Sequence, residues 1–388
     1  MAYITGKIPQ GNCGAVVYGE NGHHICSPIP DQPGKDPRAV NHVNFYAKVV
    51  GEPGETVHLD IAWPMFDEEL CGWRKYKSKP FFYNAHRCVY ISTDQIHWSR
   101  YENVVVDKER WLLQLTLTLT EATCFVSVNY YYTIPMLELL RNELCRSPWA
   151  QELTIGHSRD GQPLRLFRVT DEAVPAEEKR SIYLQAGQHC CEFGGMHLAD
   201  RMLRYLCGDT AGAALLRRKY VFHILPVVSV ADWSDGYTDE LLADSNTVWD
   251  TLSTTESKAI DSYLRSLPQA PALLIDCHNA QEHSFLICSE NLSEKRVAQL
   301  HRFNELVCTL CDFGEINRCQ FPDHEKYANF KQYALQKFGY GVTMELSRFG
   351  FYDRQKQANQ PLSHESFLRL GSQLPHAIDA FVSELTEW

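Results

Sequence analysis

Residues 181–208 read SIYLQAGQHCCEFGGMHLADRMLRYLCG, and the architecture of the larger part of the chain follows from them. The first seven residues form a short, nearly continuous apolar run that ends in Gly187, which is typical of a strand buried on both faces of a sheet. From Phe193 onward the apolar residues recur at helical spacing. A buried strand followed by such a helix is the building unit of α/β proteins.

The same alternation continues along the rest of the chain. Apolar runs of strand length are separated or followed by longer segments with a helical pattern, so we expect an α/β layer structure with a mostly parallel, mixed sheet. The expected strands are YVFHILPVVSV (220–230), PALLIDCH (271–278) and YGVTMELS (340–347). The expected helices are TESKAIDSYLRSL (255–267), EKRVAQLHRFNELVCTLC (294–311), YANFKQYALQKFG (327–339) and ESFLRLGSQLPHAIDAFVSEL (365–385).

The chain before about residue 133 has a different pattern, with short β-branched and aromatic runs separated by turn residues. These runs are HVNFYAKVV (42–50), ETVHLDIAW (55–63), CVYIS (88–92), WLLQLTLTLT (111–120) and CFVSVNYYYT (124–133). They predict a small all-β sandwich. A helical segment, IPMLELLRNEL (134–144), follows, and we place the boundary near residue 148. The prediction is therefore a β-sandwich domain with a linker helix over 1–148, and an α/β domain over 149–388.

Composition excludes several classes of function. The 388 residues carry a formal net charge of -11 and no Lys/Arg cluster, so no nucleic-acid partner is expected. There is no recognisable secretory signal at the start, and no apolar run reaches the roughly 18 residues that indicate a membrane span. The 14 cysteines lack the spacing of a disulfide framework. We therefore expect a cytoplasmic protein with reduced thiols, without predicting its oligomeric state.

Candidate metal ligands lie where the first strand meets its helix. His189 and Glu192 are three residues apart, so that both side chains can reach one point within a helical turn. Imidazole and carboxylate groups suit Zn²⁺, and a catalytic zinc site uses three protein ligands with one position open. Taken alone, this pair is a weak signal.

Two further strands end in residues of the same chemical kind. His278 closes PALLIDCH, at the strand end where α/β proteins place their sites, and Asp276 two residues earlier can orient it. Glu345 lies within the apolar strand YGVTMELS, where an acidic residue is costly unless it has a partner or a function. Any one of these residues could be an ordinary core or surface residue. Four of them, His189, Glu192, His278 and Glu345, at three strand ends are better explained by a common site.

With these motifs the chain resembles the zinc carboxypeptidase family, and within it the cytosolic carboxypeptidase branch. The family pattern His-x-x-Glu followed by a strand-end His is met by His189, Glu192 and His278, and Glu345 in TMEL matches the position of the general base. ADWSDGY and ADSNTVW resemble two further family segments, the second keeping Asn246. The aromatic strand VNYYYTIPML resembles the end of the branch's amino-terminal β-domain.

The resemblance implies the phosphorylase/hydrolase-like carboxypeptidase fold and one Zn²⁺ per chain. It implies hydrolysis of a peptide or other acyl-amino substrate through a metal-activated water, with Glu345 as the base. A family tyrosine that covers the substrate corresponds to Tyr327, although Tyr333 is also nearby. Asn246 and Arg348 complete the expected substrate-binding residues.

The sequence departs from the family where arginines are expected to bind the oxyanion and the substrate carboxylate. Thr247 stands at one such position, and no arginine lies between Tyr237 and Leu264. Three interpretations remain open. Arg348 supplies the missing guanidinium, or the substrate is an amide without a free carboxylate, cleaved by an amidase or endopeptidase, or the site binds zinc without catalysis. The retention of Glu345 argues against the last of these.

Overall fold

The structure is a computed structural model that describes residues 2–19, 23–29, 44–63, 82–236, 246, 248–280, 283–289, 292–314, 319–320, 329–353 and 356–385. The chain falls into two compact units. The first contains Met1–Met136 and Asp232–Asp244, and the second contains Leu137–Ala231 and Ser245–Trp388.

Within the described residues, the first unit is built mainly of β-strands, as expected, and contains two five-stranded sheets. One has the order β1-β4-β10-β6-β7, and the other β2-β3-β5-β9-β8. Alternate residues of the strands are buried, for example Leu113, Leu115 and Leu117 of β9. The described strands are β1 (Tyr3–Thr5), β2 (Val16–Tyr18), β3 (His23–Cys26), β4 (Phe45–Val50), β5 (Thr56–Ala62), β6 (Val89–Ser92), β7 (Ser99–Arg100), β8 (Val104–Asp107), β9 (Leu112–Thr118) and β10 (Thr123–Val128), and the 3-10 turn η3 (Ala85–Cys88) precedes β6.

An eight-stranded mixed sheet forms the centre of the second unit, with the order β11-β12-β14-β13-β15-β18-β16-β17. Its four middle strands, β14, β13, β15 and β18, run parallel to one another. The mixed, mostly parallel α/β architecture predicted from the sequence is thus confirmed. The strands are β11 (Ala150–His157), β12 (Pro163–Val169), β13 (Arg180–Ala186), β14 (Tyr220–Leu225), β15 (Leu273–Ala280), β16 (Phe285–Ile287), β17 (Cys319–Gln320) and β18 (Gly341–Ser347), and β19 (Phe351–Asp353) pairs separately with β20 (Ala358–Gln360).

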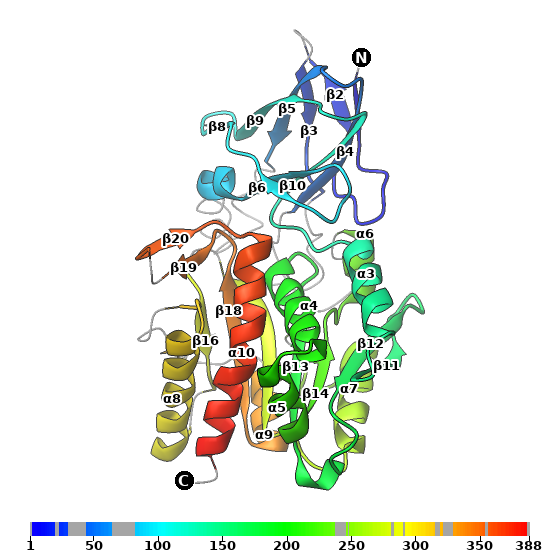
Figure 1. The fold of residues 1–388 in the computed structure, drawn as a ribbon. Helices are drawn as coiled ribbons and strands as arrows, with labels where there is room; N and C mark the ends of the chain where they lie inside the picture. Colours follow the sequence, from blue (N-terminus) through cyan, green and yellow to red (C-terminus); the bar gives the residue numbers. More distant parts are fainter. Residues whose placement is uncertain are drawn as a thin grey trace. The chain divides into compact units, whose positions relative to one another are not determined.

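Helices pack on this sheet, and Figure 1 shows α4, α5 and α10 in front of it. α10 packs against α4 and α8, while α9 contacts β15 and β18 and α7 contacts β11. Tyr183, Trp249, Phe330 and Tyr333 belong to a buried cluster that joins the sheet to α7 and α9. The described helices are α3 (Ile134–Leu144), α4 (Phe193–Cys207), α5 (Ala211–Lys219), α6 (Val230–Asp235), α7 (Thr255–Ser266), α8 (Glu294–Leu310), α9 (Phe330–Phe338) and α10 (His364–Glu384), and the 3-10 turn η4 (Ala176–Glu178) precedes β13.

Some elements differ from the sequence-based expectation. The expected strand 220–230 ends at Leu225, because Pro226 follows and cannot donate a backbone hydrogen bond to a neighbouring strand. The hairpin of β11 and β12 and the short helix α5 were not predicted. Among the described residues, no helix combines the length and apolar character needed to cross a membrane.

Candidate metal centre

The first two candidate ligands lie in the turn between β13 and α4. Gly187 follows β13 with a φ of 69°, a backbone conformation that glycine adopts at little cost. The backbone N–H of Glu192 then donates to the carbonyl of His189 at 3.1 Å, closing a tight turn directly before α4. The expectation that His189 and Glu192 lie within a helical turn is therefore wrong in detail, since Glu192 is the N-cap of α4 and not part of its first turn.

Two glycines allow α4 to lie very close to β15. A Cβ atom at Gly194 would lie 2.5 Å from Asn279 Nδ2, and one at Gly195 would lie 2.7 Å from Cys277 Cβ. Any larger residue at either position would push the helix away from the strand. The Gly-Gly pair therefore brings the turn with Glu192 next to the end of β15, where His278 is located.

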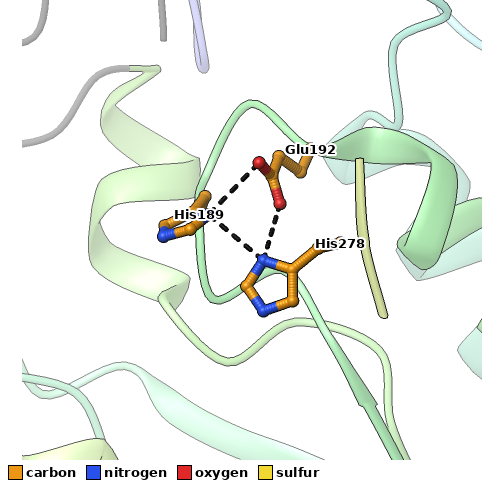
Figure 2. A group of neighbouring side chains, drawn as sticks. All are labelled: His189, Glu192 and His278. Carbon is orange, nitrogen blue, oxygen red and sulfur yellow. Dashed lines mark hydrogen bonds and ion pairs between the residues drawn. The ribbon is translucent and has the colours of Figure 1, made fainter. Parts of the chain in front are cut away.

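The side chains of His189, Glu192 and His278 converge on one point (Figure 2). Their potential ligand atoms all lie within 4.8 Å of one another. The Nδ1 atoms of His189 and His278 are 3.2 Å apart, and Glu192 Oε2 is 2.8 Å from His278 Nδ1. The structure thus brings together the three residues that the sequence singled out as ligands.

The geometry and donor set of this cluster fit a zinc ion. Tetrahedral zinc with bonds of about 2.1 Å holds its ligand atoms roughly 3.4 Å apart, close to the separations observed here. Two histidines and one glutamate are also one of the three-ligand sets of catalytic zinc sites, which leave one position for water or substrate. The His189 side chain is 14% exposed and that of Glu192 4%, so His189 is the more accessible of these two ligands.

The electrostatics of the cluster favour a bound positive charge. Burial lowers the pKa of His278, but the carboxylates of Asp276 and Glu192 outweigh burial and raise that pKa to about 10. Burial raises the pKa of Glu192, yet the neighbouring imidazoles of His189 and His278 hold it well below its usual value. The site is therefore a buried anionic environment that stabilises a cation.

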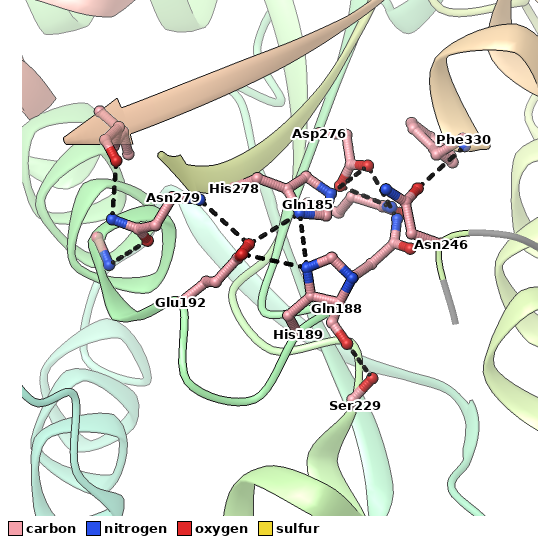
Figure 3. A network of polar contacts seen from close by, with 12 residues as sticks. Gln185, Gln188, His189, Glu192, Ser229, Asn246, Asp276, His278, Asn279 and Phe330 are labelled. Atoms are coloured by element: carbon pink, nitrogen blue, oxygen red, sulfur yellow. Dashed lines mark hydrogen bonds and ion pairs between the residues drawn. The ribbon is translucent and has the colours of Figure 1, made fainter. Parts of the chain in front are cut away.

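Asp276 contacts the ring nitrogen of His278 that does not face the other two ligands, in agreement with the orienting role that its position in the sequence suggested. Its Oδ2 atom lies 2.9 Å from His278 Nε2, and the carboxylate also accepts hydrogen bonds from Gln185 at 3.1 Å and Gln188 at 2.9 Å (Figure 3). The two glutamines were not identified from the sequence. Their only signal was the presence of amide side chains in and directly after a strand that is otherwise apolar.

Glu192 is held in place by the residue that follows His278. The backbone N–H of Asn279 donates to Glu192 Oε2 at 3.1 Å. The Asn279 side chain accepts from the backbone N–H of Gly194 at 3.0 Å and donates to the carbonyl of Leu346 at 3.0 Å. Asn279 thus ties the ligand turn to β15 and β18, and sequence reasoning missed this role.

Glu345 lies beside the ligand group on the adjacent strand. In the parallel pair β15–β18, His278 and Glu345 are register partners, so their side chains point to the same face of the sheet. Burial raises the pKa of Glu345 to about 7, although the nearby histidines favour its ionised form. A carboxylate whose pKa lies near neutrality can both accept and return a proton.

The three expected substrate-binding residues have different placements. Arg348 is 7% exposed, and one of its terminal nitrogens lies 3.6 Å from Glu192 Oε1. Asn246 accepts a hydrogen bond from the backbone N–H of Phe330 at the start of α9, at 3.4 Å. Tyr327 and Thr247 lie outside the described residues. The alternative Tyr333 belongs to the core cluster and donates to Asp261 at 2.6 Å.

Comparison with known proteins supports the family resemblance. The family model described as zinc carboxypeptidase matches residues 146–280. Cytosolic carboxypeptidase 3 of Mus musculus is 24% identical over 167 residues, and cytosolic carboxypeptidase 2 of Homo sapiens is 25% identical over 169 residues. Each match covers 39% of this chain but only 16% and 18%, respectively, of the relatives' lengths.

Solved structures share the fold over almost the whole chain. A metallo-carboxypeptidase from Burkholderia cenocepacia gives a TM-score of 0.80 at 17% identity, covering 99% of this chain and 100% of that one. A metallo-carboxypeptidase from Pseudomonas aeruginosa gives 0.76 at 16% identity, with coverages of 99% and 100%. These TM-scores and coverages establish a common fold.

The chain therefore has a carboxypeptidase fold and carries a His-Glu-His group able to hold a metal ion. It resembles the zinc carboxypeptidase family over residues 146–280, and its curated relatives are cytosolic carboxypeptidases.

Proposed function

We propose that this chain is a zinc-dependent, carboxypeptidase-like hydrolase of peptide or other acyl-amino bonds, with His189, Glu192 and His278 as metal ligands and Glu345 as the catalytic base. The main support is one arrangement. Three converging ligand side chains lie beside Glu345, which is aligned with His278 on the neighbouring strand. The family match over residues 146–280 supports the same assignment.

The chemistry divides between the metal and the protein. A zinc ion bound by the three ligands would polarise the scissile carbonyl and make the attacking water more acidic. Glu345 accepts a proton from that water and later donates it to the leaving amine. Asp276 accepts from His278 Nε2 and so leaves Nδ1 as the metal-facing atom.

A second candidate activity is the hydrolysis of amides that lack a free carboxylate, by an amidase or endopeptidase. Arg348 lies against the Glu192 carboxylate and is largely buried, so its guanidinium has a partner inside the protein. This placement favours a substrate amide that lacks a free carboxylate over one bound through Arg348. The roles of Asn246 and Tyr327 in substrate binding stay predictions.

The deciding experiment combines metal analysis with paired substrates. Protein purified without chelator is analysed for metal by mass spectrometry, and peptides with free and amidated carboxyl termini are offered to it. About one zinc per chain and cleavage of only the free-acid peptides support the carboxypeptidase activity. Zinc with cleavage of amidated peptides supports the amidase or endopeptidase activity.

Two results would contradict parts of the proposal. Zinc without hydrolysis of any peptide in a broad library would favour a binding protein. A protein that holds no zinc, even after incubation with zinc salts, would overturn the proposal as a whole. The His189→Ala variant is the control, because it should lose the metal while keeping the fold.

We also propose a cytoplasmic location. It is supported by the similarity to cytosolic carboxypeptidases, although these matches cover only part of each relative.

A further inference from the structure

Gln188 is a buried side chain next to the metal centre to which the proposed reaction assigns no role. It lies between β13 and His189, and only 2% of its surface is exposed. A buried amide has two donors and an acceptor to satisfy, so its hydrogen bonds show what it positions. Figure 3 shows the contacts of Gln188 with Asp276 and Ser229 beside the ligand group.

Trp249 determines how the amide of Gln188 is oriented. The indole N–H can only donate, and it lies 3.3 Å from Gln188 Oε1. The amide oxygen must therefore face Trp249, and the NH₂ group must face the other way. On that side it donates to Asp276 Oδ2 at 2.9 Å.

Asp276 connects this amide to a metal ligand. The same Oδ2 atom lies 2.9 Å from His278 Nε2, so it accepts from both Gln188 and the imidazole. A proton held on Nε2 leaves Nδ1 with its lone pair, and Nδ1 is the atom that faces His189 and Glu192. The orientation of Gln188 is thereby linked to the tautomer of His278.

The main chain of Gln188 is fixed independently. Its carbonyl accepts from Ser229 Oγ at 2.6 Å, and the backbone N–H of Ser229 donates to the carbonyl of Gly187 at 2.9 Å. These two bonds hold the residues that directly precede His189. Gln188 therefore restrains one histidine ligand through the backbone and the other through Asp276.

We propose that Gln188 is a positioning residue of the metal centre, which orients His278 through the Trp249–Gln188–Asp276 hydrogen-bond chain. This inference rests on the proposed function only in requiring that the site binds zinc. It concerns metal affinity and ligand geometry, which can be measured without any substrate.

The first test is zinc affinity in Gln188→Met, a side chain of similar length that makes neither hydrogen bond. We expect zinc binding to weaken by about 10-fold, the lower end of the loss typical for a hydrogen-bond partner of a metal ligand, because Gln188 acts on His278 through Asp276. The absorption spectrum of the cobalt-substituted protein should shift as well, because the geometry around the metal changes. The circular dichroism of the metal-free variant should match that of the wild type.

Gln299→Met is the matched control. Gln299 is another buried glutamine of the same unit, on α8, and it accepts a hydrogen bond from Tyr340. Its replacement should reduce folding stability without altering zinc affinity or the cobalt spectrum. An equal loss of affinity in both variants would mean a general packing effect and would overturn the inference.

The second test uses Trp249→Phe, which removes the N–H that orients the amide but keeps the aromatic packing against Phe330 and Tyr333. We expect Trp249→Phe to bind zinc more weakly than the wild type does. The double variant of Trp249→Phe and Gln188→Met should bind zinc no more weakly than Gln188→Met alone. Additive losses of zinc affinity would show that Trp249 acts independently of Gln188 and would refute the proposed hydrogen-bond chain.

The outcomes also separate this inference from the proposed function. If wild-type protein binds zinc and Gln188→Met binds it equally well with an unchanged cobalt spectrum, only the positioning role fails. If the wild-type protein does not bind zinc, the proposed function fails first. If Gln188→Met does not fold, the Trp249→Phe variant still decides the question.

Discussion

At the scale of single residues, the site depends on charged groups kept close together in the protein interior. Glu192 has two imidazoles as neighbours, and His278 has two carboxylates. Removing one member of such a group leaves the others buried and without compensation, which costs more than the loss of one contact. A substitution in this group should therefore affect proton transfer without affecting metal binding only when the new side chain has the same shape as the old one.

Glu345→Gln is the substitution that preserves shape. We expect kcat to fall by about 100- to 10,000-fold, because the amide cannot accept a proton, while zinc content stays at the wild-type level. Steady-state kinetics and metal analysis on the same preparation check both parts. Glu305→Gln, at an exposed position on α8, should leave both unchanged. Near wild-type turnover in Glu345→Gln would remove Glu345 from the mechanism.

At the scale of elements, the position of α4 determines whether the ligands can meet. The helix lies between β15 and α10, and glycines permit both close approaches. On the α10 side, a Cβ atom at Gly371 would lie 2.5 Å from Arg201 Cβ and 2.8 Å from the backbone nitrogen of Met202. Backbone atoms cannot move aside as a flexible side chain can.

Gly371→Ala should therefore destabilise the protein, although alanine ordinarily favours a helix. We expect the free energy of unfolding to drop by about 1–3 kcal/mol, the usual cost of overpacking a core. Ser372→Ala, one residue further along α10, is the control and should be nearly neutral. Denaturant unfolding of both variants measures the difference, and equal stabilities would show that α10 can shift without cost.

At the scale of the whole molecule, folding and metal binding should be coupled. The three ligands come from the turn before α4 and from the end of β15, which are distant in sequence and meet only in the folded chain. A metal bound by such a site stabilises the folded state over the unfolded state. Metal removal should therefore be visible in thermal stability.

Treatment with a chelator should lower the melting temperature, and zinc added back should restore it. We expect a stabilisation of about 4 kcal/mol when free zinc exceeds its dissociation constant 1,000-fold. Differential scanning calorimetry measures the shift. The His189→Ala variant should melt at the same temperature with and without chelator, and a chelator effect of full size in that variant would point to a different metal site.

Acid stability should depend on His223, which lies on β14 with its Nδ1 atom 2.7 Å from the Tyr263 hydroxyl. Burial, with a smaller effect of Arg168, lowers the pKa of His223 to about 3, against 6.5 for an unperturbed histidine. Between these two values the unfolded chain binds a proton at this residue and the folded chain does not. The free energy of unfolding therefore falls as pH falls from 6.5 towards 3, by about 1.4 kcal/mol per pH unit from this residue.

The change in stability between pH 7.5 and pH 5 tests this expectation on metal-free protein. His223→Gln should lose roughly 2 kcal/mol less than the wild type over that interval, because glutamine does not titrate. His157→Gln, at an exposed position on β11, should follow the wild type. A wild-type pH dependence in His223→Gln would show that other groups cause the acid sensitivity.

The amino-acid sequence by itself determined the α/β alternation, the all-β first part and the identity of the candidate ligands. These features are local. A buried strand such as 181–187 and the pair His189 and Glu192 can be recognised from residues that are neighbours in sequence. His278 and Glu345 could be added because parallel strands place their carboxyl ends at one edge of a sheet.

Only the tertiary structure decided how these residues are supported. Gln188, Asn279 and Trp249 acquire their roles from partners that the sheet and helices bring to them, such as Asp276 for Gln188 and Leu346 for Asn279. The sequence also carried no sign that Arg348 would lie against Glu192. Strand order and register create these contacts, and both depend on long-range packing, which local sequence patterns do not encode.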